Sequence, residues 1–253
     1  MVRTTVQNGD HALFVQVQPL VSYHGMQASA PLLNDVVAHY LPLHGLSLQD
    51  FFTYYPLLGF IEALYYQARE AVEKMSVESA LHPAWRDYQP LISQLLKEQG
   101  LEHPLIDQQL EDIDEYLALI RKLTIHGSGT HAEVVRTAEL GMADCRLLHA
   151  IVMLLLNQTI NMQLFDTLWP LETWGEIDWN VTAGANTVSA SGYNIYQMFT
   201  NLYGEEARRQ LQIEQARYWS LFQERLALIP AEEQQRCLDF HARYQQDRTE
   251  FNI

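Results

Sequence analysis

The sequence predicts an all-α protein, a single bundle of about eight to ten helices around an apolar cavity. Three observations support this prediction. The 253 residues are 48% hydrophobic and 19% charged, a composition typical of a globular chain with a full core. Apolar side chains recur at helical spacing over most of the chain. No stretch rich in Gly, Pro or Ser is long enough to separate two domains, so we expect one all-α domain over 1–253, with an irregular segment at 1–30.

Start and stop signals divide the chain into helices. Ser47 is expected to cap a long helix at 48–75, in which Pro56 and Gly59 should cause a kink. Thr130 and Glu133 form a capping-box pattern after a Gly-Ser-Gly loop. The other expected helices cover 31–40, 83–96, 104–125, 131–141, 142–168, 193–202, 205–228 and 231–251.

Three further segments are expected to differ from these helices. Residues 14–18 alternate between apolar and polar side chains, as a short strand does, although no partner strand is evident. Pro170 is expected to begin a short segment that ends near Trp179. Residues 182–191 are rich in Gly, Ala, Ser and Asn, which is typical of a mobile loop.

The charge and cysteine content exclude several classes of partner. The net charge is −15, so we expect no nucleic-acid partner, because nucleic acids bind clustered Lys and Arg. No run of apolar residues is long enough for stable membrane insertion, and Met1–Asp10 has no signal-peptide pattern. Cys145 and Cys237 give no disulfide framework. A cytoplasmic protein is therefore the expectation.

The most informative segment is the apolar helix expected at 142–168. It carries a stripe of side chains that share about one third of the helix circumference. They are Arg146, His149, Met153, Asn157 and Asn161. Unpaired polar groups would be costly in such an apolar environment. Either neighbouring helices supply partners for the stripe, or the stripe lines a cavity, which is the interpretation we favour.

A second polar group lies on the helix expected at 104–125. Asp107, Asp114 and Arg121 are spaced seven residues apart at the border of its apolar face, and Glu111 lies one step further out. Carboxylates at such a border can point into a cleft and hold a divalent cation. The alternative is a solvated acidic face, and the spacing does not separate the two.

Glu62 is the only carboxylate in a run of aromatic and apolar residues, with Tyr66 and Arg69 on the same helical face. If it is buried, it must be paired or have a shifted pKa. The many aromatic side chains of this helix fit either a packed core or the wall of a pocket for a hydrophobic small molecule.

From Tyr116 to Tyr203 the chain resembles the class I terpenoid synthase superfamily. In that family an Asp-rich motif and an Asn-Asp-x-x-Ser-x-x-x-Glu motif lie on two helices and hold Mg²⁺ and the substrate diphosphate. Here Asn157 and Asn161 match positions of the second motif, but Phe165 replaces its acid, and Asp166 comes one residue late.

The resemblance implies a terpenoid-synthase-like lyase that uses Mg²⁺ and an isoprenoid diphosphate. Asp107, Glu111 and Asp114 would hold the metal in place of the Asp-rich motif. Arg121, as the diphosphate sensor, and Arg146 would contact the diphosphate. The candidate catalytic residues are Arg121, Arg146 and His149, and the candidate cofactor-binding residues are Glu62, Asn157 and Asn161. Further polar residues that fit the resemblance are Arg243, Tyr244, Glu172, Glu176 and Asp178.

Three alternatives remain open. The first is a non-enzymatic helical protein that binds a ligand or a partner, with the polar stripe satisfied by its neighbours. The second is a metal-dependent oxidase on a helical bundle, in which His149, Glu62 and Glu139 would be ligands. The third is a helical protein that forms a homodimer through the face of Tyr54–Tyr66.

Overall fold

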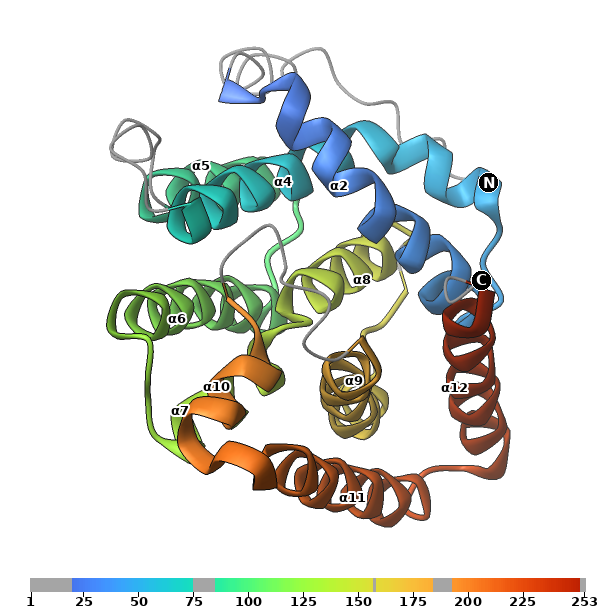
Figure 1. The fold of residues 1–253 in the computed structure, drawn as a ribbon. Helices are drawn as coiled ribbons and strands as arrows, with labels where there is room; N and C mark the ends of the chain where they lie inside the picture. The colour runs from blue at the N-terminus through green and yellow to red at the C-terminus, as the bar shows by residue number, and fades with distance from the viewer. Residues whose placement is uncertain (1–19, 75–84, 157, 184–192, 251–253) are drawn as a thin grey trace.

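A computed structural model describes residues 20–74, 85–156, 158–183 and 193–250. All regular structure in these ranges is helical, which confirms the predicted all-α class (Figure 1). The helices are α2 (Tyr23–Asp35), the π-helical turn η2 (Val36–Tyr40), α3 (Leu41–Leu43), α4 (Leu48–Lys74), α5 (Trp85–Glu98), α6 (Pro104–His126), α7 (His131–Leu140), α8 (Ala143–Leu155), α9 (Met162–Ala183), α10 (Ile195–Tyr203), the 3₁₀ turn η5 (Gly204–Glu206), α11 (Ala207–Leu226) and α12 (Ala231–Glu250).

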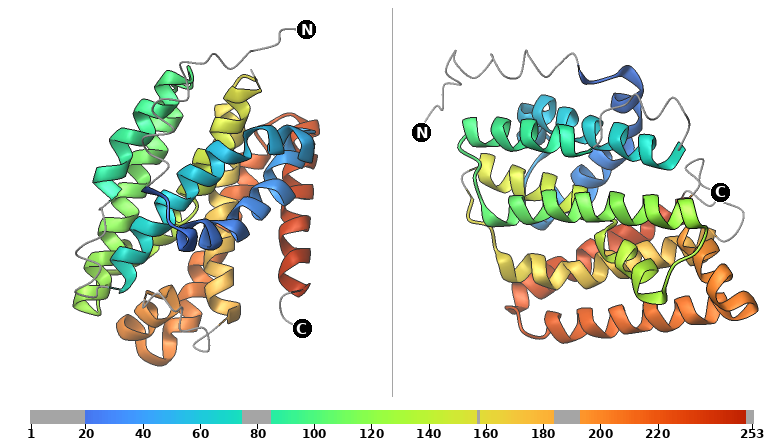
Figure 2. Two further views of the ribbon diagram at one scale, coloured as in Figure 1. Left: turned by 90° about the horizontal axis from the view of Figure 1, so that it is seen from above. Right: turned by 90° about the vertical axis from the view of Figure 1, so that its left-hand side faces the viewer.

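Helices α8 and α9 occupy the middle of this arrangement. In Figure 1, α4 and α2 lie on one side of α8, α6 on another, and α11 and α12 enclose α9. The most extensive contacts are those of α9 with α11, α2 with α4, and α6 with α8. Figure 2 shows α9 and α11 running side by side over most of their length. The polar side chains of α8, Asp144, Arg146 and His149, are buried within this arrangement.

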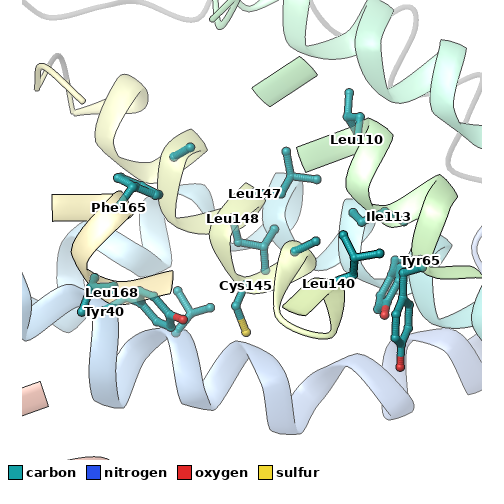
Figure 3. Close-up of a cluster of buried hydrophobic side chains, with 14 of the residues drawn as sticks. Tyr40, Tyr65, Leu110, Ile113, Leu140, Cys145, Leu147, Leu148, Phe165 and Leu168 are labelled. Carbon is teal, nitrogen blue, oxygen red and sulfur yellow. The ribbon is translucent and has the colours of Figure 1, made fainter. Parts of the chain in front are cut away.

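The apolar face of α6 packs against α8 and α4 as its spacing predicts. Ile106, Leu110, Ile113, Leu117 and Ile120 are all buried. Leu147 and Leu148 of α8 are buried in the same cluster, which Figure 3 shows in close-up. Burying each such side chain contributes about 1.5–3 kcal/mol. The expected apolar cavity stays a prediction, because these side chains belong to one cluster of buried residues.

The ends of α6 and α7 follow the local signals of the sequence. Pro104 stands in the first turn of α6, and Gly127 ends this helix in a left-handed conformation with φ of 62°. Thr130 accepts a hydrogen bond from the backbone N–H of Glu133, and the Glu133 side chain accepts from the N–H of Thr130. The predicted capping box at 130–133 is confirmed.

The prediction of one continuous helix at 142–168 is wrong. Helix α8 ends at Leu155 and α9 begins at Met162. The side chain of Asn161 accepts a hydrogen bond from the N–H of Leu164 at 3.2 Å, so it caps the start of α9. The expectation followed the apolar residues on both sides and passed over the mostly polar residues 157–161 that separate them.

Two other boundaries differ from expectation. Helix α2 begins at Tyr23, inside the segment expected to be irregular. Pro170 lies within α9 instead of beginning a segment. A proline leaves the carbonyl four residues earlier without its helical donor. Here Arg225 of α11 donates a hydrogen bond to that carbonyl, of Asp166, so a tertiary contact compensates for the loss.

The expected strand at 14–18 lies outside the described residues, as does most of the loop expected at 182–191. None of the described helices is long and apolar enough to span a membrane.

Candidate functional site

Arg146 of α8 is the centre of a buried polar network. Its Nε donates to Oε1 of Gln109 in α6 at 2.9 Å, and one terminal nitrogen donates to Oε2 of Glu172 in α9 at 2.9 Å. The other terminal nitrogen donates to the carbonyl of Glu139 at 3.1 Å. The guanidinium group is therefore satisfied by three helices, as a buried charge requires.

The second oxygen of Glu172 extends this network to the π-helical turn. It accepts a hydrogen bond from the hydroxyl of Tyr40 at 2.5 Å. Burial, and then the neighbouring Glu172 carboxylate, raise the pKa of Tyr40 well above its usual value. Tyr40 is therefore a hydrogen-bond donor at neutral pH, and both oxygens of Glu172 have partners.

His149 lies one helical turn after Arg146 and pairs with His44. The two Nε2 atoms lie 2.5 Å apart, so one imidazole donates to the other. The His149 ring stacks on Phe165, with centroids 4.4 Å apart. Burial lowers the pKa of both side chains, that of His44 to about 4, so both are neutral at pH 7.

A narrow crevice opens beside the Tyr40–Glu172 hydrogen bond. It is lined by His39, Tyr40, Met142, Leu171, Glu172, Phe240 and Tyr244. The Phe240 ring lies 5.1 Å from Tyr40 and 5.8 Å from His39 between centroids, and the Tyr244 ring lies 5.6 Å from His39. Four rings from η2 and α12 thus surround the crevice next to one carboxylate.

Gly175 explains how Tyr244 can reach this position. A Cβ atom at Gly175 would lie 2.6 Å from Cε1 of Tyr244, which is closer than any real contact. Glycine inside a helix costs about 1 kcal/mol relative to alanine. The close approach of the Tyr244 ring to the α9 backbone is the physical reason for a glycine here.

Glu62 is buried, with 1% of its surface exposed. Its Oε1 has no hydrogen-bond partner among the described residues. Burial, and then the charge of Asp144, raise the pKa of Glu62 well above its usual value, while Arg69 opposes the shift. Burial also raises the pKa of Asp144, to about 6. Glu62 lies beside a second carboxyl group and away from the His44–His149 pair, so the structure does not bring it together with His149.

The residues predicted to hold Mg²⁺ do not converge. Asp107 and Glu111 are exposed on the outer face of α6. Asp114 is half-buried and lies 3.5 Å from Nε of Arg86. Among the residues that the structure describes, no three His, Cys, Asp or Glu side chains form a group that could hold a metal ion. A magnesium site needs several converging oxygen ligands, so these side chains do not fit one.

The remaining predicted residues are also separated. Arg121 is exposed, and Asn157 lies outside the described residues. Asn161 caps α9 and donates to Oε1 of Glu233 in α12 at 3.0 Å, so its polar atoms are used in joining helices. Of the predicted residues that the structure describes, Arg146, His149, Glu172 and Tyr244 lie at the crevice or in its network.

Sequence reasoning identified Arg146, His149 and Glu172 but missed their partners. Tyr40 and His44 belong to segments far from α8 in the chain, and no local pattern marks them. Asp144 had a weak signal, as an acid in the first turn of an apolar helix. Comparison with protein-family models, curated proteins and solved structures finds no match to this chain.

Proposed function

We propose that the chain is a helical ligand-binding protein that takes up a small, largely apolar ligand, one end of which enters the crevice at the π-helical turn. One observation carries this proposal. Four aromatic rings from two segments far apart in the chain surround a narrow opening that has a single carboxylate at its edge. Ligand sites typically have mainly apolar and aromatic walls with a few polar groups.

The π-helical turn supports the choice of this site. Residues 36–40 form a π-helix. Such turns are rare in proteins, and those that occur are often at functional sites. The turn contributes two of the rings, His39 and Tyr40. Phe240 and Tyr244 come from α12, one turn apart on the same helix. A modest shift of α12 would therefore change the width of the opening.

The charges at the crevice favour an uncharged group. Glu172 is its only acidic lining residue, and Arg146 neutralises that carboxylate at 2.9 Å. The enclosed space holds about one water-sized group. A methyl group or the edge of a small ring fits these limits, with the remainder of the ligand on the outer surface.

Terpenoid-synthase-like chemistry with Mg²⁺ stays a prediction that gains no support from Asp107, Glu111 and Asp114. The metal-dependent oxidase also lacks a set of ligands, because Glu62 and His149 are in different clusters. The alternative in which neighbours satisfy the polar stripe is the one that the Arg146 network favours.

The proposal is tested with the neutral fluorescent probe N-phenyl-1-naphthylamine. Gly175→Ala would push the Tyr244 ring away from α9 and distort the crevice. We expect the wild-type protein to bind the probe with a rise in fluorescence, and Gly175→Ala to bind it at least fivefold more weakly.

Gly59→Ala in α4 is the matched control. A Cβ atom there meets its nearest neighbour at 3.6 Å, an ordinary contact, so this variant should bind the probe as the wild-type protein does. Equal binding by Gly175→Ala and Gly59→Ala, or no binding by the wild-type protein, would contradict the proposal.

A further inference from the structure

A hydrogen-bonded chain of three side chains connects α7, α10 and α11, and none of its residues lines the crevice. Nδ1 of His131, the first residue of α7, lies 2.8 Å from the hydroxyl of Tyr203 at the end of α10. Nε2 of the same imidazole lies 3.1 Å from Oε1 of Glu214 in α11. Three helices thus contribute one side chain each.

The carboxylate determines which nitrogen of His131 carries the proton. An ionised carboxylate only accepts hydrogen bonds, so Nε2 of the neutral imidazole must donate to Glu214. Nδ1 then has a lone pair and accepts a hydrogen bond from the hydroxyl of Tyr203. In this tautomer His131 is oriented as a base toward the tyrosine.

The surroundings hold this geometry in place. Glu214 is buried, and its other oxygen accepts a hydrogen bond from Arg217 at 3.0 Å. The ring of His131 packs edge-on against Phe199, with centroids 5.4 Å apart. The capping box that begins at Thr130 defines the start of α7 directly before His131. The His131 side chain is still 35% exposed, so molecules in solution can approach it.

A hydroxyl, an imidazole and an orienting carboxylate in this order are the components of an activated nucleophile. We propose that Tyr203 is a reactive hydroxyl that accepts an acyl group from an ester. In this step a bond forms between the tyrosine oxygen and the acyl carbon, and the bond from that carbon to the ester oxygen breaks. His131 takes the proton of Tyr203 and passes it to the departing oxygen, while Glu214 holds the imidazole.

The test is acetylation by p-nitrophenyl acetate at pH 7.5, with the modified tyrosines located by mass spectrometry. Tyr23 is an internal control because it is 79% exposed and its hydroxyl accepts a hydrogen bond from the amide of Gln27, which is not a base. We expect Tyr203 to be acetylated at least tenfold faster than Tyr23, although it is less exposed.

Two variants separate activation from simple exposure. His131→Gln removes the base, and the rate at Tyr203 should fall at least tenfold while the rate at Tyr23 is unchanged. Glu214→Gln presents an amide that can donate to Nε2 and so permits the other tautomer of His131. The rate of acetylation of Tyr203 should therefore fall severalfold. Glu224→Gln, an exposed change on the same helix, should have no effect.

The proposal is overturned if Tyr203 reacts no faster than Tyr23, or if Glu214→Gln and His131→Gln leave its rate unchanged in proteins that keep the wild-type circular dichroism spectrum.

Discussion

Two buried polar clusters on α8 are only two residues apart but have opposite balances of charge. Arg146 lies between Glu172, Gln109 and a backbone carbonyl, so each of its nitrogens has a partner. Asp144 lies near Glu62, whose Oε1 has no partner among the described residues, and burial raises the pKa of both carboxyl groups. Neighbouring positions on one helix can therefore carry a buried pair of opposite charges, here called the matched cluster, and a buried pair of carboxyl groups, here called the unmatched cluster. The first stabilises the fold and the second destabilises it when the carboxyl groups are charged.

The largest expected effect comes from breaking the matched cluster. Arg146→Met would leave Glu172 buried without its ion-pair partner, which typically costs about 3–5 kcal/mol of unfolding free energy. Urea unfolding at pH 7, followed by circular dichroism, measures this loss. In a Glu172→Gln background the same substitution should cost at least about 1 kcal/mol less, because no uncompensated charge remains. Equal costs in both backgrounds would show that the ion pair is not the source.

Acid should weaken the His44–His149 pair, whose second member lies in the middle of α8. Burial lowers the pKa of His44 from 6.5 to about 4, so its contribution to stability is full above pH 6.5 and is lost as the pH falls through 4. A shift of this size corresponds to a loss of about 3 kcal/mol. We expect His44→Asn to flatten the fall in unfolding free energy between pH 6.5 and 4. The exposed His126→Asn should leave that slope unchanged, and a slope in His44→Asn equal to wild type would refute the assignment.

The stability contributed by Glu62 in the unmatched cluster should change with pH in the opposite direction to that of His44. The pKa of Glu62 is raised in the folded protein, so its contribution to stability is full below its unfolded value of 4.5 and is lost as the pH rises through the raised value. Glu62→Gln should therefore increase the unfolding free energy by about 1–2 kcal/mol at pH 8 and change it little at pH 4. Thermal or urea unfolding at the two pH values measures the difference. A loss of stability at pH 8 would mean that the charged form has a partner.

The smallest effect is expected on the outer face of α6. Asp107→Asn combined with Glu111→Gln changes two exposed carboxylates, so the unfolding free energy should change by less than about 0.5 kcal/mol. The melting temperature with Mg²⁺ and inorganic diphosphate should be the same for this variant and the wild-type protein. A stabilisation of the wild-type protein that requires both additions and disappears in the variant would restore the predicted magnesium site.

The local features of the fold could be predicted. The apolar spacing of α6 and the capping box at Thr130 depend on residues within one or two turns, so the chain itself contains the whole signal. The course of α9 through Pro170 could not be predicted in this way, because it depends on Arg225 from another helix. The break before α9 has a local signal in the N-cap residue Asn161, which the apolar pattern alone does not reveal.

The sequence by itself determined that α8 would be an apolar helix with polar side chains that require partners in the core. Only the tertiary structure decided which residues are those partners. Glu172 and Tyr40, which form one hydrogen-bonded network with Arg146, are 132 residues apart in the chain and meet only after the helices pack. The same packing put Asp107 and Glu111 in solvent and Glu62 beside Asp144. A carboxylate at the border of a helix face is compatible with both environments, and the choice between them depends on which neighbour covers that face.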